Sequence, residues 1–265
     1  MAAGDSPSRL VRAAPFVGRA EEIASFDRWL TEAAAGQPRV ALIEGDAGIG
    51  KTRVLAEVRS LAAHRGMRVC FGRCYEDLAL PCLPFVESLG PHLERMPDDV
   101  RQALGPQFDF VEQVLRRVET TPSGARPSPA FQADHERLQL LLAVGRLIVE
   151  LARRSPTLFV IDDLHWADRL SLDLFEHLAF TVAELAGRES VPLLIVGSYR
   201  PAPTTGRFAR LTVRLAREEI CRRLTLRGLD EAEIRELLGA LGFRRPSHQL
   251  TVTMSDATQG NPLFI

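Results

Sequence analysis

Runs of consecutive apolar residues alternate along the chain with segments whose apolar residues recur at helical spacing. Four runs predict buried strands at 39–44, 67–72, 157–162 and 192–199, and residues 222–226 form a weaker fifth run. Apolar strands that alternate with amphipathic helices are typical of a parallel sheet covered by helices. We therefore predict an α/β fold with a five-stranded, mostly parallel sheet flanked by helices.

The helical periodicity also predicts where the main helices lie. The first ends at Gly36 and the second near Gly66, and the others cover 131–153, 171–185 and 229–241. Glycine just after the last periodic residue is a common stop signal, which places the first two ends.

Residues 75–155 have a less regular pattern. Five prolines are expected to break this segment into short helical pieces: Pro81, Pro84, Pro91, Pro97 and Pro106. Residues 120–130 are rich in proline, glycine and serine, which predicts a flexible loop. We expect most of the segment to form a lid or side layer within one domain over 16–265. Residues 1–15 are expected to be a disordered N-terminal stretch.

A glycine-rich loop follows the first predicted strand and leads into a predicted helix. Its residues are Gly45, Asp46, Ala47, Gly48, Ile49, Gly50, Lys51 and Thr52. The glycines allow backbone N–H groups to turn toward a phosphate, and the helix adds the positive end of its dipole. The pattern predicts a phosphate-binding loop in which Lys51 reaches the β- and γ-phosphates and the Thr52 hydroxyl binds Mg²⁺.

Composition supports a special role for Lys51. The chain has 33 basic residues, and Lys51 is the only lysine among them. A compact ammonium group on a flexible stem is what a phosphate cluster requires, which explains why arginine did not replace it. The alternative is a glycine turn before a helix that matches the motif by chance.

Two adjacent acids, Asp162 and Asp163, end the third predicted strand. A buried carboxylate needs a partner, and Mg²⁺ bound to phosphate would supply one. In the phosphate-loop fold the first acid orients Mg²⁺ and its water, and the second can polarise the attacking water. We assign these roles to Asp162 and Asp163. The alternative is that they only cap the following helix.

Arg200 stands at the C-terminal end of the fourth predicted strand. The C-terminal ends of parallel strands line the ligand crevice, so Arg200 is placed to sense the γ-phosphate. A surface arginine at the start of a loop is the alternative interpretation.

Bulk properties exclude several classes of protein. The 265 residues carry a net charge of −1, which creates no global field for nucleic acid or an anionic membrane. No pair of cysteines has the two-residue gap common in zinc or redox sites, so structural free thiols are expected at 70, 74, 82 and 221. The chain shows no signal peptide and no membrane-length apolar run, which predicts a cytoplasmic protein.

Five ordered motifs resemble the ATPase module of STAND-type signal-transduction ATPases. They are 16–19, 45–52, 161–168, 197–200 and 260–264. Within that group the pattern is most similar to the Orc-like AAA module of large LuxR-type transcriptional regulators and related multidomain signalling proteins. The resemblance implies a P-loop ATPase that binds ATP or ADP with Mg²⁺ and acts as a switch, with self-association or partner-protein contact when ATP binds.

The resemblance also implies roles for residues outside the phosphate loop. Val17, Gly18, Arg19 and Pro262 would lie near the adenine, and Arg200 would be a sensor arginine. His165 and Trp166 match the family's usual continuation after the two acids. In the family, winged-helix, repeat and DNA-binding modules follow the last motif. Because the chain stops at Ile265, we expect a truncated module or fragment without direct nucleic-acid binding.

Three other functions are alternatives to an ATPase. A Ras-type GTPase would need an Asn/Thr-Lys-x-Asp motif, which is excluded because the chain has one lysine, Lys51, and one asparagine, Asn261. A small-metabolite kinase would bring an arginine-rich lid, for which residues 120–130 are the candidate. A nucleotide-dependent interaction module with negligible turnover stays open, because Asp163 is shorter than the glutamate of fast ATPases.

Overall fold

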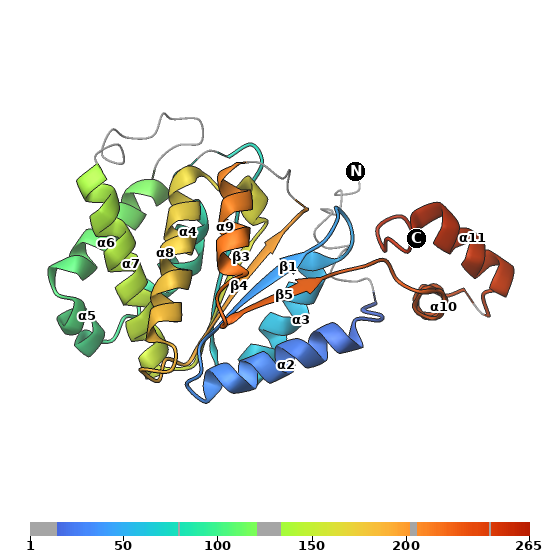
Figure 1. Cartoon of the computed structure of the whole chain (residues 1–265), viewed down its shortest axis with the longest axis horizontal. Helices are drawn as coiled ribbons and strands as arrows, with labels where there is room; N and C mark the ends of the chain where they lie inside the picture. Colours follow the sequence, from blue (N-terminus) through green and yellow to red (C-terminus); the bar gives the residue numbers. More distant parts are fainter. Residues whose placement is uncertain (1–14, 79, 121–133, 202–205, 244) are drawn as a thin grey trace, which may run out of the picture.

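A parallel β-sheet forms the centre of the molecule in the computed structural model (Figure 1), which describes residues 15–78, 80–120, 134–201, 206–243 and 245–265. The strands are β1 Arg39–Glu44, β2 Arg68–Arg73, β3 Thr157–Asp162, β4 Leu193–Tyr199 and β5 Cys221–Thr225. Their order in the sheet is β2-β3-β4-β1-β5, and all neighbouring pairs are parallel. The prediction of an α/β fold with a five-stranded sheet is therefore confirmed.

The strand bounds follow the apolar runs, with small corrections. The predicted bounds of β1 and β3 are those observed. β2 begins one residue late because the Met67 N–H bonds back to the Ala62 carbonyl of the preceding helix, at 3.0 Å. β4 excludes Pro192, which has no N–H for the ladder. β5 begins at Cys221 rather than at residue 222.

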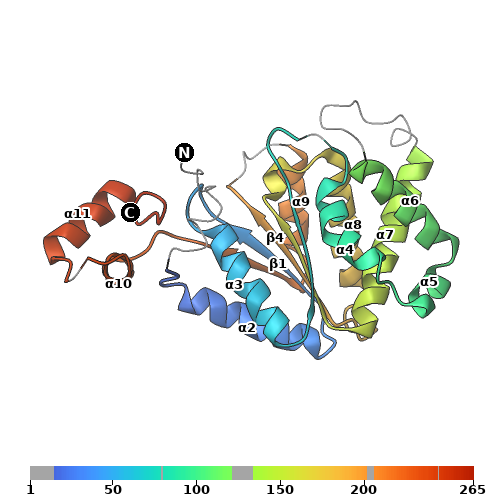
Figure 2. The ribbon, with the colours of Figure 1, turned by 180° about the vertical axis from the view of Figure 1, so that it is seen from behind.

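Successive side chains of β3 point to opposite faces of the sheet, as strand geometry requires. Leu158 and Val160 share a buried cluster with α2 (Ala20–Ala34) and α3 (Lys51–His64). Phe159 and Ile161 belong to a larger cluster on the other face. Figures 1 and 2 show α2 and α3 on one face of the sheet, and the helices from α4 to α9 on the other.

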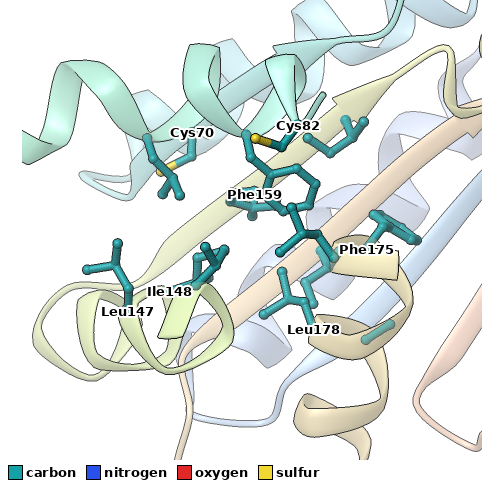
Figure 3. Close-up of a cluster of buried hydrophobic side chains, with 14 of the residues drawn as sticks. Cys70, Cys82, Leu147, Ile148, Phe159, Phe175 and Leu178 are labelled. Atoms are coloured by element: carbon teal, nitrogen blue, oxygen red, sulfur yellow. The ribbon is translucent and has the colours of Figure 1, made fainter. Parts of the chain in front are cut away.

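The less regular segment at 75–155 forms a side layer on that second face. The helices on that face are α4 Leu83–Leu93, α5 Asp98–Leu104, α6 Pro106–Glu119, α7 Asp134–Arg154, α8 Arg169–Leu185 and α9 Arg207–Leu215, of which α4 to α7 belong to the segment. Figure 3 shows Phe159 of β3 among Cys82, which precedes α4, Ile148 of α7 and Phe175 of α8. These four side chains are at most 1% exposed. The side layer is therefore part of the main core.

The prolines of this segment differ in effect. Pro84 and Pro106 occupy the first turns of α4 and α6, where a missing N–H costs little, and Pro97 precedes α5. Pro91 lies inside α4, so the prediction that it breaks the chain was wrong. Packing in the core, where Phe85 is fully buried, holds the helix across this position.

The predicted loop and N-terminal stretch fall largely outside the described residues. Residues 1–14 and 121–133 are among those not described, and they include most of the predicted loop and the first three residues of the predicted helix at 131–153. Within the described ranges, none of the helices combines the length and the apolar composition that crossing a bilayer takes.

Two C-terminal helices form a small third cluster beside the sheet. They are α10 Glu231–Ala240 and α11 His248–Thr258, and Figure 1 shows them beyond β5, near the C-terminus. A capping box between Asp230 and Glu233 begins α10. Val17 and Ile265 pack against the apolar side chains of this cluster, so both ends of the described chain meet there.

Candidate functional site

Residues 45–50 connect β1 to α3, and residues 51 and 52 begin that helix. The φ angles of Gly48 and Gly50 are 77° and 103°, a conformation that side chains other than hydrogen disfavour. Helix α3 begins at Lys51, and no side chain caps its N-terminus. Uncapped N–H groups and the helix dipole make this end of α3 suitable for an anion.

The Lys51 side chain folds back over this loop. Its Nζ donates hydrogen bonds to the carbonyl oxygens of Gly45 at 2.7 Å and Asp46 at 2.9 Å. Burial lowers the pKa of Lys51, and the nearby Asp163 carboxylate acts in the opposite direction. The ammonium group is therefore poorly hydrated and held beside the helix N-terminus, where a phosphate would be attracted.

The Asp162 carboxylate lies fully buried at the end of β3, beside the loop. Its Oδ2 accepts hydrogen bonds from Thr52 Oγ1 at 3.0 Å and from Arg73 Nη2 at 2.6 Å. Its Oδ1 accepts from the Ser198 hydroxyl. The structure therefore brings together Thr52 and Asp162, the two residues predicted to bind Mg²⁺, and adds Arg73 and Ser198 to them.

Asp163 turns away from the strand in a left-handed conformation, with φ of 60°. Its N–H donates to Ser198 Oγ at 2.9 Å. Burial raises the pKa of Asp163, and the adjacent Asp162 raises it further. The alternative that the two acids only cap the following helix was wrong. Asp163 precedes the short 3-10 helix Leu164–Trp166 without a side-chain cap bond, and Asp168 caps α8 by accepting from the N–H groups of Leu170 and Ser171.

His165, Trp166 and Arg200 lie next to the acids. In His165 both ring nitrogens are buried without a hydrogen-bond partner in the described part of the chain, and Nδ1 is 3.9 Å from Asp163 Oδ1. Burial, together with the charges of Arg200 and Lys51, lowers the pKa of His165 to about 4. The Arg200 side chain is exposed, with its Cζ 5.9 Å from the centre of the Trp166 ring.

A mostly apolar cavity of about 200 Å³ lies beside the loop. It is lined by Val17 and Arg19 near the N-terminus, by Gly48 in the loop, and by Pro262 near the C-terminus, together with Leu237 of α10. The residues that the resemblance places near an adenine thus surround one cavity beside the glycine loop, with Gly18 next to them in sequence.

Arg19 and Gly18 also hold three parts of the chain together. The Arg19 Nη2 donates to the Ile49 carbonyl at 3.2 Å and to the Arg227 carbonyl at 2.5 Å. Gly18 has φ of 68°, and a Cβ there would lie 2.4 Å from Oε1 of Glu233. The segment therefore fastens the glycine loop to the connection between β5 and α10.

Three residues of this site were missed by sequence reasoning. Arg73 and Ser198 lie at the ends of β2 and β4, and the strand-end criterion that selected Arg200 would have found both. Asn261 lies in the motif at 260–264 but had no predicted role, and its amide donates to the Ala47 carbonyl at 2.8 Å. The available signal for Asn261 was that it is the single asparagine in the 265-residue sequence.

Several solved structures resemble this chain at low sequence identity. The structure of Drosophila ORC bound to DNA is 14% identical, covers 100% of this chain and 60% of that chain, and has a TM-score of 0.50. AMPPCP-bound DnaA from Aquifex aeolicus is 14% identical, covers 98% of this chain and 62% of that chain, and has a TM-score of 0.49. A STAND protein with a tetratricopeptide repeat sensor from Pyrococcus horikoshii is 20% identical, covers 94% of this chain and 30% of that chain, and has a TM-score of 0.48.

Sequence comparison gives a curated relative and a family. An uncharacterized protein of Rhizobium meliloti (strain 1021) is 29% identical over 276 residues, which cover 95% of this chain and 24% of that protein. The chain thus spans about a quarter of the length of this relative. The model of the AAA ATPase domain matches residues 15–196, more than half of the chain. The chain therefore belongs to the AAA ATPase domain family.

Proposed function

We propose that this chain binds ATP together with Mg²⁺ and hydrolyses it slowly to ADP and phosphate. The observation that carries the proposal is the convergence of the Lys51 ammonium, the uncapped N-terminus of α3 and the Thr52–Asp162 pair around one glycine loop. A negatively charged triphosphate chain is the ligand that matches a cation, free helix amides and a metal-binding oxygen pair together.

The base and the phosphates would occupy different parts of the site. The apolar cavity beside Val17, Arg19 and Pro262 suits a flat, weakly polar ring such as adenine. The phosphates would lie along residues 45–52, where the backbone N–H groups and Lys51 can hold them. Gly18 would permit the close approach of the N-terminal segment to this cavity.

The Mg²⁺ position is supported by the donor set. Hydroxyl and carboxylate oxygens are hard ligands that Mg²⁺ prefers, and those of Thr52 and Asp162 are 3.0 Å apart. The Arg73 guanidinium bonds to both oxygens, which supports a cation position there. When bound, Mg²⁺ would offset the charge of the phosphates. Asp163 would polarise the attacking water, and Arg200 would sense the γ-phosphate.

The wider role that we propose is the nucleotide switch of a longer signalling or transcription-regulatory protein of the LuxR type. The five motifs support this role, and the chain covers only 24% of the length of its curated relative. ATP binding would then control self-association or contact with a partner protein.

Equilibrium binding of a fluorescent ATP analogue tests the proposal. Lys51→Ala removes the ammonium group and should weaken binding at least about tenfold, since a hydrogen bond to a charged group contributes roughly 1.5–3 kcal/mol. Arg65→Ala, at the far end of the same helix α3, is the matched control and should bind as the parent does. Equal affinity of Lys51→Ala and the parent would refute the phosphate-loop assignment.

One observation favours a second function, a nucleotide-dependent interaction module with negligible turnover. The acid in the water-polarising position is an aspartate, and its Oδ2 is 3.9 Å from the Arg73 guanidinium, which draws the carboxylate toward the strand end. Phosphate release under saturating Mg·ATP separates the two functions. Loss of release in Asp163→Ala with binding retained supports hydrolysis, whereas no release by the parent supports the interaction module.

A further inference from the structure

A guanidinium group bridges the two oxygens that suit a magnesium ion. Arg73 Nη2 lies 2.6 Å from Asp162 Oδ2 and 3.2 Å from Thr52 Oγ1, and Arg73 Nε lies 3.2 Å from the same carboxylate oxygen. Arg73 reaches this position because it is the register partner of Asp162 in the β2–β3 ladder. The register of β2 against β3 therefore places the Arg73 guanidinium against the oxygens of Asp162 and Thr52.

The arginine and a metal ion would compete for one oxygen atom. Asp162 Oδ1 is already bonded to the Ser198 hydroxyl, which leaves Oδ2 as the atom to which Thr52 and Arg73 both bond. Mg²⁺ binds oxygen at about 2.0–2.1 Å with strict octahedral geometry. A guanidinium in contact with both oxygens fills that space, and the two cations repel each other.

We propose that Arg73 is a resident counter-cation, which neutralises Asp162 in the nucleotide-free protein and is exchanged for Mg²⁺ when nucleotide binds. This inference rests on the proposed function of the site. Asp162 is 0% exposed, and a buried carboxylate without a partner is strongly destabilising. The arginine thus keeps the empty site folded, and it makes Mg²⁺ binding depend on displacing a charge that is already present.

The surroundings of Arg73 allow its side chain to leave without moving the strand. The side chain is 34% exposed, in contrast to its buried partner. Its Nε is 3.9 Å from Asp163 Oδ2, so a second carboxylate can receive the guanidinium. The Arg73 backbone N–H is held by Glu87 Oε2 of α4 at 2.9 Å. Exchange therefore requires a rotation of the side chain alone.

Thermal unfolding with MgCl₂ alone and nucleotide binding across a Mg²⁺ titration test the inference on the full chain. In Arg73→Gln, MgCl₂ without nucleotide should raise the Tm more than in the parent. Mg²⁺ should increase the affinity for the ATP analogue, and the Mg²⁺ concentration that gives half of this increase should be roughly fivefold lower in the variant. A fivefold change is the upper range for removing an ion pair with a partly exposed partner. Arg68→Gln is the matched control at the other end of β2, where the side chain bonds to the Leu151 carbonyl, and should behave as the parent.

Other outcomes are equally decisive. The inference would be overturned if Arg73→Gln showed the same Mg²⁺ dependence as the parent. It would also be overturned if the variant bound the analogue more weakly by the same factor with Mg²⁺ and with EDTA, because Arg73 would then be a nucleotide ligand. If Arg73→Gln does not fold, Arg73→Lys should show a smaller shift in the same direction, and no shift would overturn the inference. Failure of the proposed function is recognised separately, by Lys51→Ala binding the analogue as tightly as the parent.

Discussion

The side-chain amide of Asn261 donates a hydrogen bond of 2.8 Å to the carbonyl of Ala47, which joins the C-terminal segment to the glycine loop. The same side chain accepts from the Leu263 N–H at 3.1 Å. Gly48 makes this contact possible, because a Cβ there would lie 2.7 Å from the Leu263 side chain. The α10–α11 unit is therefore attached directly to the loop in which we place the phosphates.

Replacement of Asn261 should weaken both the fold and the site. Asn261→Ala leaves the Ala47 carbonyl and the Leu263 N–H without this partner, and should lower the free energy of unfolding by about 1–3 kcal/mol. Urea unfolding measures this, and the ATP analogue should bind more weakly. Gln249→Ala removes an exposed amide from α11 and serves as the control. Equal stability of the two variants would show that the contact contributes nothing.

Gly72 should tolerate no side chain. A Cβ at Gly72 would lie 1.8 Å from the Pro84 carbonyl oxygen, so Gly72→Ala must push α4 away from β2. The expected cost is about 1–3 kcal/mol, the usual range for overpacking. Gly239 lies within α10 and has open space around it, so Gly239→Ala should stabilise the protein by about 0.5–1 kcal/mol. Chemical denaturation of the two variants should therefore give shifts of opposite sign.

His165 should make stability depend on pH in the acidic range. Its pKa is lowered from 6.5 to about 4, so between these values the unfolded chain binds a proton that the folded protein does not. The contribution of His165 to the free energy of unfolding is therefore fully present above about pH 6.5. It is lost progressively as the pH falls toward about 4. His165→Asn should flatten this part of the curve of unfolding free energy against pH. The control variant His64→Asn, at an exposed position of α3, should retain the slope of the parent.

Arg200 should affect the choice between nucleotides rather than binding itself. If its guanidinium senses the γ-phosphate, Arg200→Ala should reduce the ratio of ATP to ADP affinity several-fold, because the interaction that it removes is made with ATP alone. Competition titrations with both nucleotides give this ratio. Arg210→Ala, an exposed arginine on α9, is the control. An unchanged ratio of ATP to ADP affinity in Arg200→Ala would mean that Arg200 is a surface residue that does not sense the γ-phosphate.

Much of the fold could be predicted because its signals are local. Each buried strand is a short apolar run, and the loop at 45–52 carries its own glycines and its single lysine. The errors arose where distant residues decide the outcome. Pro91 is a helix breaker by local rules, yet α4 continues past it because its side chains pack into a core built from the sheet and α7.

The sequence by itself determined the elements of this protein and the chemical nature of its loop, since apolar periodicity and glycine act over a few residues. The tertiary structure decided the partners of that loop. Arg73 and Asp162 are 89 residues apart, and the register of β2 against β3 places a guanidinium on the carboxylate. The pairing of Asn261 with Ala47 likewise spans 214 residues. Such contacts depend on strand order and register, which no local pattern specifies.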